Sequence, residues 1–126
     1  MKNLIIYIVF LLSLPLFSCA QSLDPQNEMT VETLKQQLEN DSTLVLVDVR
    51  TEPELTGPLG HIPGIIHIPL QELNERFTEL ETYKNQPIAI ICRSGNRSSV
   101  ATKLLVEKGF KVKNVLGGMK AWNKME

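Results

Sequence analysis

Short apolar runs that alternate with amphipathic stretches constrain the fold of this 126-residue chain more than any other feature. Residues 44–47 and 88–91 form continuous apolar runs rich in β-branched side chains, which is typical of parallel strands buried on both faces. Helical periodicity follows in residues 70–80 and 97–108. Strands that alternate with helices predict an α/β domain with a central, mainly parallel sheet flanked by helices on both faces.

Turn formers and shorter apolar runs predict the remaining elements. Thr30 is expected to cap a short helix, and residues 53–60 are expected to form a loop because they contain prolines and glycines. Further strands are expected at residues 65–68 and 112–116, before a last helix that holds Trp122 as a core residue. The longer helices are expected to bury Leu73, Phe77, Leu80, Val100, Ala101, Leu104 and Leu105.

Cys92 lies at the junction between a predicted strand and a predicted helix. At this place a sulfur faces the first free N–H groups of the helix and the positive end of its dipole, which favour a thiolate over a thiol. Arg93 and Arg97 add two positive charges close by in the sequence. The alternative is a small buried cysteine that ends a strand, but two neighbouring arginines have no obvious place beside such a residue.

The residues between the two arginines are small and polar. Gly95 and Asn96 tolerate positive φ, and with Ser94 they allow successive backbone N–H groups to turn inward as an anion-binding nest. The pattern predicts a cradle that holds an anion on or beside the sulfur of Cys92.

The loop of residues 92–98 resembles the active-site loop of the rhodanese-like sulfurtransferases. Three more stretches match this family in the expected order, so the resemblance covers the chain from about Thr30 to Trp122. The stretches are Asp48, Val49, Arg50; residues 60–64 with 68–70; and Gly117, Gly118, Ala121, Trp122. The resemblance implies that residues 30–126 form one rhodanese-like α/β domain. The chain departs from the family in residues 54–60, where the loop is longer than usual and Leu55 replaces an aromatic residue.

The resemblance also implies a double displacement in which Cys92 carries sulfur as a persulfide. The thiolate would attack the outer sulfur of thiosulfate or a similar anionic donor, and cyanide, sulfite, another thiol or a protein partner would accept the sulfur. No metal or organic cofactor is expected. The expected substrate-binding residues are Arg93, Ser94, Gly95, Asn96, Arg97 and Ser98.

Loop length separates this interpretation from the cysteine-dependent phosphatases and arsenate reductases. Their loops place one more residue between cysteine and arginine than the four that separate Cys92 from Arg97. Where that longer spacing would need its arginine, this chain has Ser98. Two other hypotheses remain beside the enzyme, namely a protein-to-protein sulfur carrier and a rhodanese-like binding module without turnover.

Two further groups of polar residues have simpler structural interpretations. Asp48 and Arg50 resemble an ion-paired scaffold beside the loop, although they could also touch the substrate. His61 and His67 lack a nearby cluster of carboxylates or thiolates, so a zinc site is not expected and both histidines fit packed turns.

The N-terminus has the pattern of a secretory signal. Lys2 precedes an apolar run over residues 4–17 that is too short for a confident membrane span, so residues 1–18 are expected to be cleaved. Residues 16–19 resemble the lipobox of bacterial lipoproteins, in which Cys19 would carry the lipid and residues 19–29 would form a tether. Ordinary cleavage after Ala20 is the alternative. The expected location is extracytoplasmic, on the periplasmic side of a bacterial membrane.

Composition is consistent with one small domain behind this leader. The chain has 13 basic and 14 acidic residues, a formal net charge of −1 that gives no basic surface for nucleic acid. If Cys19 is lipidated, Cys92 is the only thiol left, so an intramolecular disulfide is not expected.

Overall fold

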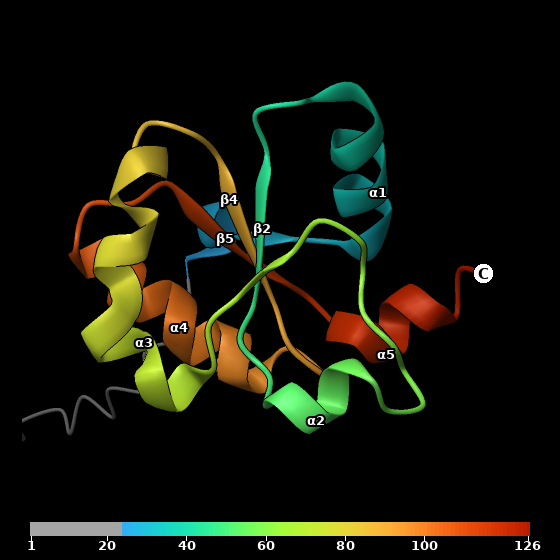
Figure 1. Cartoon of the computed structure of the whole chain (residues 1–126). Helices are drawn as coiled ribbons and strands as arrows, with labels where there is room; N and C mark the ends of the chain where they lie inside the picture. The colour runs from blue at the N-terminus through green and yellow to red at the C-terminus, as the bar shows by residue number, and fades with distance from the viewer. Residues whose placement is uncertain (1–23) are drawn as a thin grey trace, which may run out of the picture.

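The computed structural model describes residues 24–126 and contains one five-stranded sheet (Figure 1). The predicted signal peptide, the lipidation site Cys19 and both cleavage sites lie outside the described residues. Within residues 24–126, no helix has the length and apolar content needed to cross a membrane.

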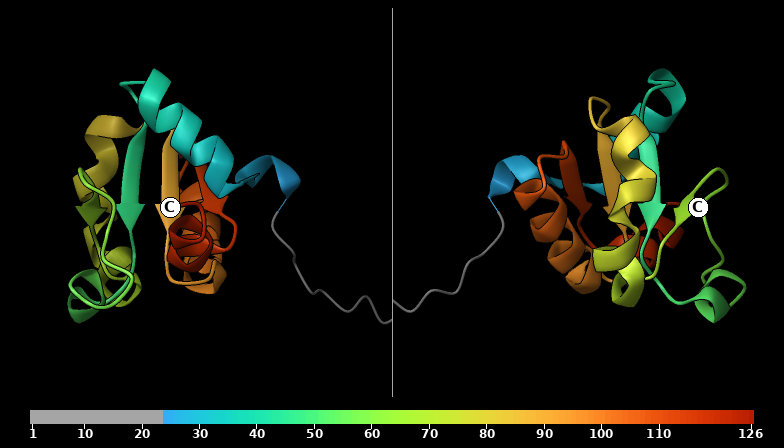
Figure 2. Two further views of the ribbon diagram at one scale, coloured as in Figure 1. Left: turned by 90° about the vertical axis from the view of Figure 1, so that its right-hand side faces the viewer. Right: turned by 60° about the vertical axis from the view of Figure 1, so that its left-hand side comes forward.

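All neighbouring strands of the sheet are parallel, in the spatial order β1-β5-β4-β2-β3. The strands are β1 (Glu28–Met29), β2 (Val45–Asp48), β3 (Ile66–His67), β4 (Ile88–Ile91) and β5 (Val112–Val115). The predicted parallel α/β sheet is therefore confirmed. Because the strands are parallel, their carboxyl ends meet at one edge of the sheet, which is where α/β domains place ligand sites (Figure 2).

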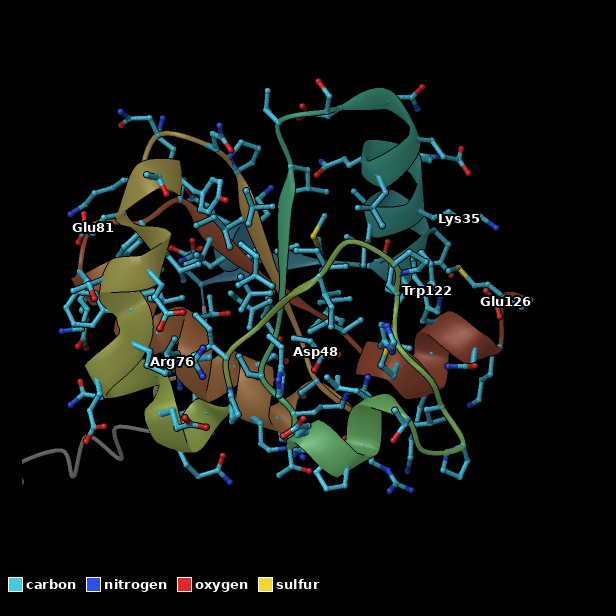
Figure 3. All side chains as sticks on the ribbon, in the orientation of Figure 1. Lys35, Asp48, Arg76, Glu81, Trp122 and Glu126 are labelled. Atoms are coloured by element: carbon cyan, nitrogen blue, oxygen red, sulfur yellow. The ribbon has the colours of Figure 1, made fainter. Side chains whose placement is uncertain are left out.

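Helices cover both faces of the sheet. One core lies between the sheet and α1 (Val31–Asn40) with α5 (Gly118–Asn123), where Leu34 and Met119 are fully buried. The other core lies beneath α3 (Leu70–Arg76) and α4 (Asn96–Glu107), and Leu73 and Leu105 are buried there. Figure 3 shows Asp48 near the centre of the fold, with Arg76 and Trp122 on opposite sides.

The predicted tether ends earlier than expected. Pro25–Asn27 forms a turn of 3-10 helix, and Glu28–Met29 forms β1, which pairs with β5. Met29 is buried in the core beside α1. Burial of the Met29 side chain and backbone pairing with β5 both stabilise this segment in the folded domain, whereas a free tether would have neither.

Three local predictions about helices also need correction. Val100 is 54% exposed, because it lies on the outer face of α4, whereas Ala101 and Leu105 are buried as expected. The helix from Leu70 ends at Arg76 and continues as 3-10 helix over Phe77–Tyr83, so Phe77 is only half-buried.

The segment expected to be a loop begins with α2 (Glu52–Leu55). The Glu54 carboxylate accepts hydrogen bonds from the backbone N–H and the hydroxyl of Thr51, and this capping arrangement starts a helix despite Pro53. α2 lies below the carboxyl edge of the sheet in Figure 1.

Candidate active site

Cys92 directly follows β4 and is 1% exposed. The backbone N–H of Gly95 donates to its sulfur at 3.1 Å, and the Ser98 hydroxyl oxygen lies 3.2 Å from the same sulfur. Burial raises the pKa of the Cys92 thiol, but hydrogen bonds from the Ser98 side chain and from the backbone at Ser98, Gly95 and Ser94 outweigh it. The net effect is a pKa below that of an ordinary cysteine, as a nucleophilic sulfur requires.

The first residues of α5 bind two backbone carbonyls at the start of the Cys92 loop and so fix its orientation. The N–H of Met119 donates to the Cys92 carbonyl at 2.8 Å, and the N–H of Lys120 donates to the Arg93 carbonyl at 3.0 Å. A trans peptide directs its C=O and its N–H to opposite sides, so fixing these two carbonyls turns the following N–H groups away from α5 and into the loop. The expected nest therefore depends on α5 as well as on its own small residues.

Two glycines permit this close approach. At Gly118, a Cβ would collide with the Cys92 carbonyl oxygen and would lie 2.7 Å from the Arg93 carbonyl carbon. Gly95 has a φ of +100°, and a Cβ at this position would lie 3.3 Å from the backbone nitrogen of Gly117. The sequence indicated Gly95 as a residue that tolerates positive φ and Gly118 as part of the family resemblance, but not that these glycines let the loop and α5 pack together.

A buried polar side chain on β5 completes the environment of the sulfur. Asn114 is 3% exposed, and its Oδ1 accepts a hydrogen bond from the Ser98 hydroxyl at 2.5 Å. Its Nδ2 donates to the carbonyl of Gly95 at 3.3 Å. Sequence reasoning missed Asn114, although an amide two residues after Val112, on the side of the strand expected to be buried, was a usable signal because buried amides need partners.

Arg97 forms a two-point ion pair with Glu54 of α2. Its Nη1 and Nη2 lie 2.8 and 2.7 Å from the two carboxylate oxygens. Arg97 is the main reason why the pKa of Glu54 falls from 4.5 to about 2. Glu54 was not among the predicted site residues, because the two side chains are far apart in the sequence.

Arg93 differs from Arg97 in its surroundings. Arg93 is exposed, and within residues 24–126 its guanidinium forms neither a hydrogen bond nor an ion pair. It lines a cavity of about 60 Å³ together with Arg50, Glu54 and residues 57–59. The unusually long loop thus forms one wall of a small pocket beside Arg93. Ser94 and Asn96, in the same loop as Arg93, are also exposed.

Asp48 and Arg50 form the buried ion pair that the sequence suggested. Their side chains are 0% and 1% exposed, and Arg50 Nη2 lies 2.8 Å from Asp48 Oδ2. Arg50 also donates to the carbonyls of Glu54 and Gly60 at 3.3 and 2.7 Å, so the pair joins β2 to the segment that carries Glu54. The arrangement is that of a scaffold.

Both histidines contact backbone carbonyls. His61 Nδ1 lies 2.9 Å from the carbonyl of Leu55, and His67 Nε2 lies 2.6 Å from the carbonyl of Arg50. In the part of the chain from 24 to 126, no group of three His, Cys, Asp or Glu side chains is placed to hold a metal.

These features define a class of protein: an α/β domain with a buried cysteine of lowered pKa in a hydrogen-bonding loop at the carboxyl edge of a parallel sheet. The model of the rhodanese-like domain matches residues 30–125, and the chain belongs to this family.

Curated relatives carry sulfur-related names. The chain is 43% identical over 96 residues to "Putative sulfur carrier protein YrkF" of Bacillus subtilis, covering 75% of this chain and 50% of that protein. It is 36% identical over 97 residues to "Sulfurtransferase" of Allochromatium vinosum, covering 76% and 87% of the two chains. The chain thus spans half the length of the first relative and most of the second.

Solved structures agree with this assignment. The rhodanese-related protein of Thermoplasma volcanium superposes with a TM-score of 0.70 at 30% identity, over 79% of this chain and 92% of that one. The rhodanese α/β fold is confirmed, and the chain is a member of a family of sulfurtransferases and sulfur carriers.

Proposed function

We propose that the protein transfers sulfane sulfur through a persulfide on Cys92. The sulfur of the Cys92 thiolate forms a bond to the outer sulfur of an anionic donor such as thiosulfate, and the S–S bond of the donor breaks. Sulfite leaves with the electron pair of that bond, and the acceptor later removes the outer sulfur and restores the thiolate. The observation that carries this proposal is the hydrogen bonding of Cys92, which lowers its pKa despite complete burial.

The loop supplies stabilisation for each anionic stage. Inward N–H groups would bind the negative charge of the thiolate and of the persulfide, as preorganised donors do in other anionic intermediates. Arg93, which is exposed and lines the small pocket beside the loop, would attract the donor and stabilise the leaving sulfite. Arg97 would join it when its pairing with Glu54 is relaxed.

Persulfide formation can be observed directly. Protein treated with thiosulfate should gain about 32 Da on the peptide that contains Cys92, and cyanide should remove this mass. Cys92→Ser should show neither the adduct nor thiosulfate:cyanide activity, because a serine hydroxyl is too basic to supply the anion. A well-folded Ser variant that keeps the activity would refute the proposal.

A protein-to-protein sulfur carrier is the second candidate. It is favoured by the relative named as a sulfur carrier and by the Glu54 carboxylate, which neutralises one of the two arginines at the loop. If the protein is a thiosulfate sulfurtransferase, its rate of sulfur transfer to a small acceptor such as cyanide should exceed its rate of transfer to a protein thiol. For a carrier, the persulfide should form slowly from thiosulfate but move quickly between protein cysteines.

The N-terminal pattern supports a location proposal. Cleavage before Cys19 and lipidation of its sulfur would anchor the domain to the periplasmic side of a bacterial membrane, because several acyl chains give durable attachment. Wild-type and Cys19→Ala proteins should fractionate with membrane and soluble material, respectively. Unmodified soluble protein that begins at Gln21 would favour ordinary secretion instead.

A further inference from the structure

The hydrogen bonds of Ser98 raise a question of proton count. A hydroxyl has one proton to donate, yet the Ser98 oxygen lies within hydrogen-bonding distance of both Asn114 Oδ1 and Cys92 Sγ. A thiolate can only accept, whereas a thiol can donate its own proton. The direction of the Ser98 hydroxyl is therefore linked to the protonation state of Cys92.

The carbonyl of Gly95 fixes the orientation of the Asn114 amide. It accepts from Nδ2, so a flipped amide would bring two oxygens together and lose this bond. Oδ1 must then face Ser98, and a carbonyl oxygen can only accept. The Ser98 proton points to Asn114, and the lone pairs of the hydroxyl are left to face the sulfur.

We propose that Asn114 is a positioning residue that sets the ionisation of Cys92 by holding the Ser98 proton away from the sulfur. With the hydroxyl turned to Asn114, Ser98 accepts the S–H of a neutral thiol. When Cys92 ionises, the hydroxyl must rotate to the thiolate, and the buried Oδ1 loses its donor. Asn114 thus favours the thiol over the thiolate.

The same competition bears on the persulfide. This consequence rests on the proposed function, whereas the effect on ionisation does not. In a persulfide the negative charge is on the outer sulfur, and Sγ becomes an uncharged, weak acceptor. The Ser98 hydroxyl can then return to Asn114, so Asn114 disfavours the empty thiolate relative to the sulfur-loaded form.

The charges around Cys92 come from other elements. Arg97 of α4 interacts electrostatically with Cys92, and Asp48 of β2 interacts with Arg97. Each of these two side chains has an ion-pair partner, Glu54 and Arg50 respectively. The hydrogen bonds of Asn114 go to Ser98 and Gly95, so a substitution at position 114 leaves these charges in place.

The experiment measures the pKa of Cys92 in the full chain, without requiring turnover. Iodoacetamide alkylation is followed as a function of pH, and peptide masses separate Cys92 from Cys19. Asn114→Leu removes the acceptor while keeping the number and branching of side-chain heavy atoms, and it should lower the pKa by about one unit, the equivalent of one hydrogen bond. Ser98→Ala should raise the pKa because the thiolate loses a donor.

The double variant provides the decisive comparison. Without the hydroxyl, Asn114 has nothing to orient, so Asn114→Leu should leave the pKa of Cys92 unchanged in the Ser98→Ala background. An equal shift in both backgrounds, or no shift in either, would overturn the proposal. If Asn114→Leu does not fold, Asn114→Ser is used, and the same disappearance of its effect with Ser98→Ala is required. Failure of this test would leave the persulfide mass unchanged, so the two proposals can be judged separately.

Discussion

Glu54→Gln tests whether the carboxylate of α2 restrains Arg97. An anionic donor that binds Arg97 must compete with Glu54 for the same two guanidinium nitrogens. Glutamine removes the charge but keeps an oxygen that can accept from the N–H of Thr51, so the start of α2 is preserved. We therefore expect the variant to bind anionic donors more tightly.

The size of the effect follows from the pKa of Glu54. Pairing, chiefly with Arg97, places this pKa at about 2 instead of 4.5, which corresponds to about 3 kcal/mol in favour of the ionised carboxylate. The side chains of Arg97 and Glu54 remain 32% and 28% exposed, so solvent screening reduces the usable energy to about 1–2 kcal/mol. The kcat/KM for thiosulfate should then rise by roughly 5-fold to 30-fold.

Thiocyanate formation from thiosulfate and cyanide measures this change. Glu52→Gln is the matched control, since it makes the same change of charge on the same helix at an exposed position. The gain should be confined to Glu54→Gln and should shrink at high salt, where the donor's charge is screened. A fall in kcat/KM for Glu54→Gln alone would refute the reasoning and show that Glu54 holds Arg97 in its working position.

Three shorter predictions concern other parts of the site. Arg93→Ala should reduce kcat/KM for thiosulfate by a factor equivalent to about 1–3 kcal/mol, with partial recovery in Arg93→Lys, and unchanged kinetics would exclude a role in donor binding. Gly118→Ala should destabilise the fold and change the alkylation rate of Cys92, because its Cβ has no room against the loop. Gly64 also has a positive φ, but a Cβ there meets open space. Gly64→Ala should therefore lower the free energy of unfolding, measured in urea, by only about 1–2 kcal/mol and leave the reactivity of Cys92 unchanged. The Glu54–Arg97 pair should stabilise the fold above pH 4.5, and this contribution should disappear as the carboxylate is protonated on the way down to a pH of about 2. The difference in free energy of unfolding between wild type and Glu54→Gln should therefore narrow over that interval. A difference that stays constant with pH would contradict the assignment of this ion pair.

Local sequence patterns were sufficient for the elements that carry their own signals. The apolar run at Ile88–Ile91, the small residues after Cys92 and the helical periodicity of residues 97–108 each reflect backbone preferences within a few residues. β1 and α2 were missed for a different reason. The pairing of Glu28–Met29 depends on β5, which lies at the other end of the chain, and Pro53 concealed a helix that Glu54 caps.

The same distinction explains which site residues could be predicted. Cys92 and its arginines are adjacent in the sequence, so their proximity needed no fold. Glu54 and Asn114 reach the loop only because the carboxyl ends of neighbouring parallel strands converge at one edge. Both residues act on the charge balance of the loop: Glu54 offsets Arg97, and Asn114 directs the proton of Ser98. Since neither changes the loop sequence, two domains with the same cysteine motif can differ in donor preference and thiol reactivity through these distant positions alone.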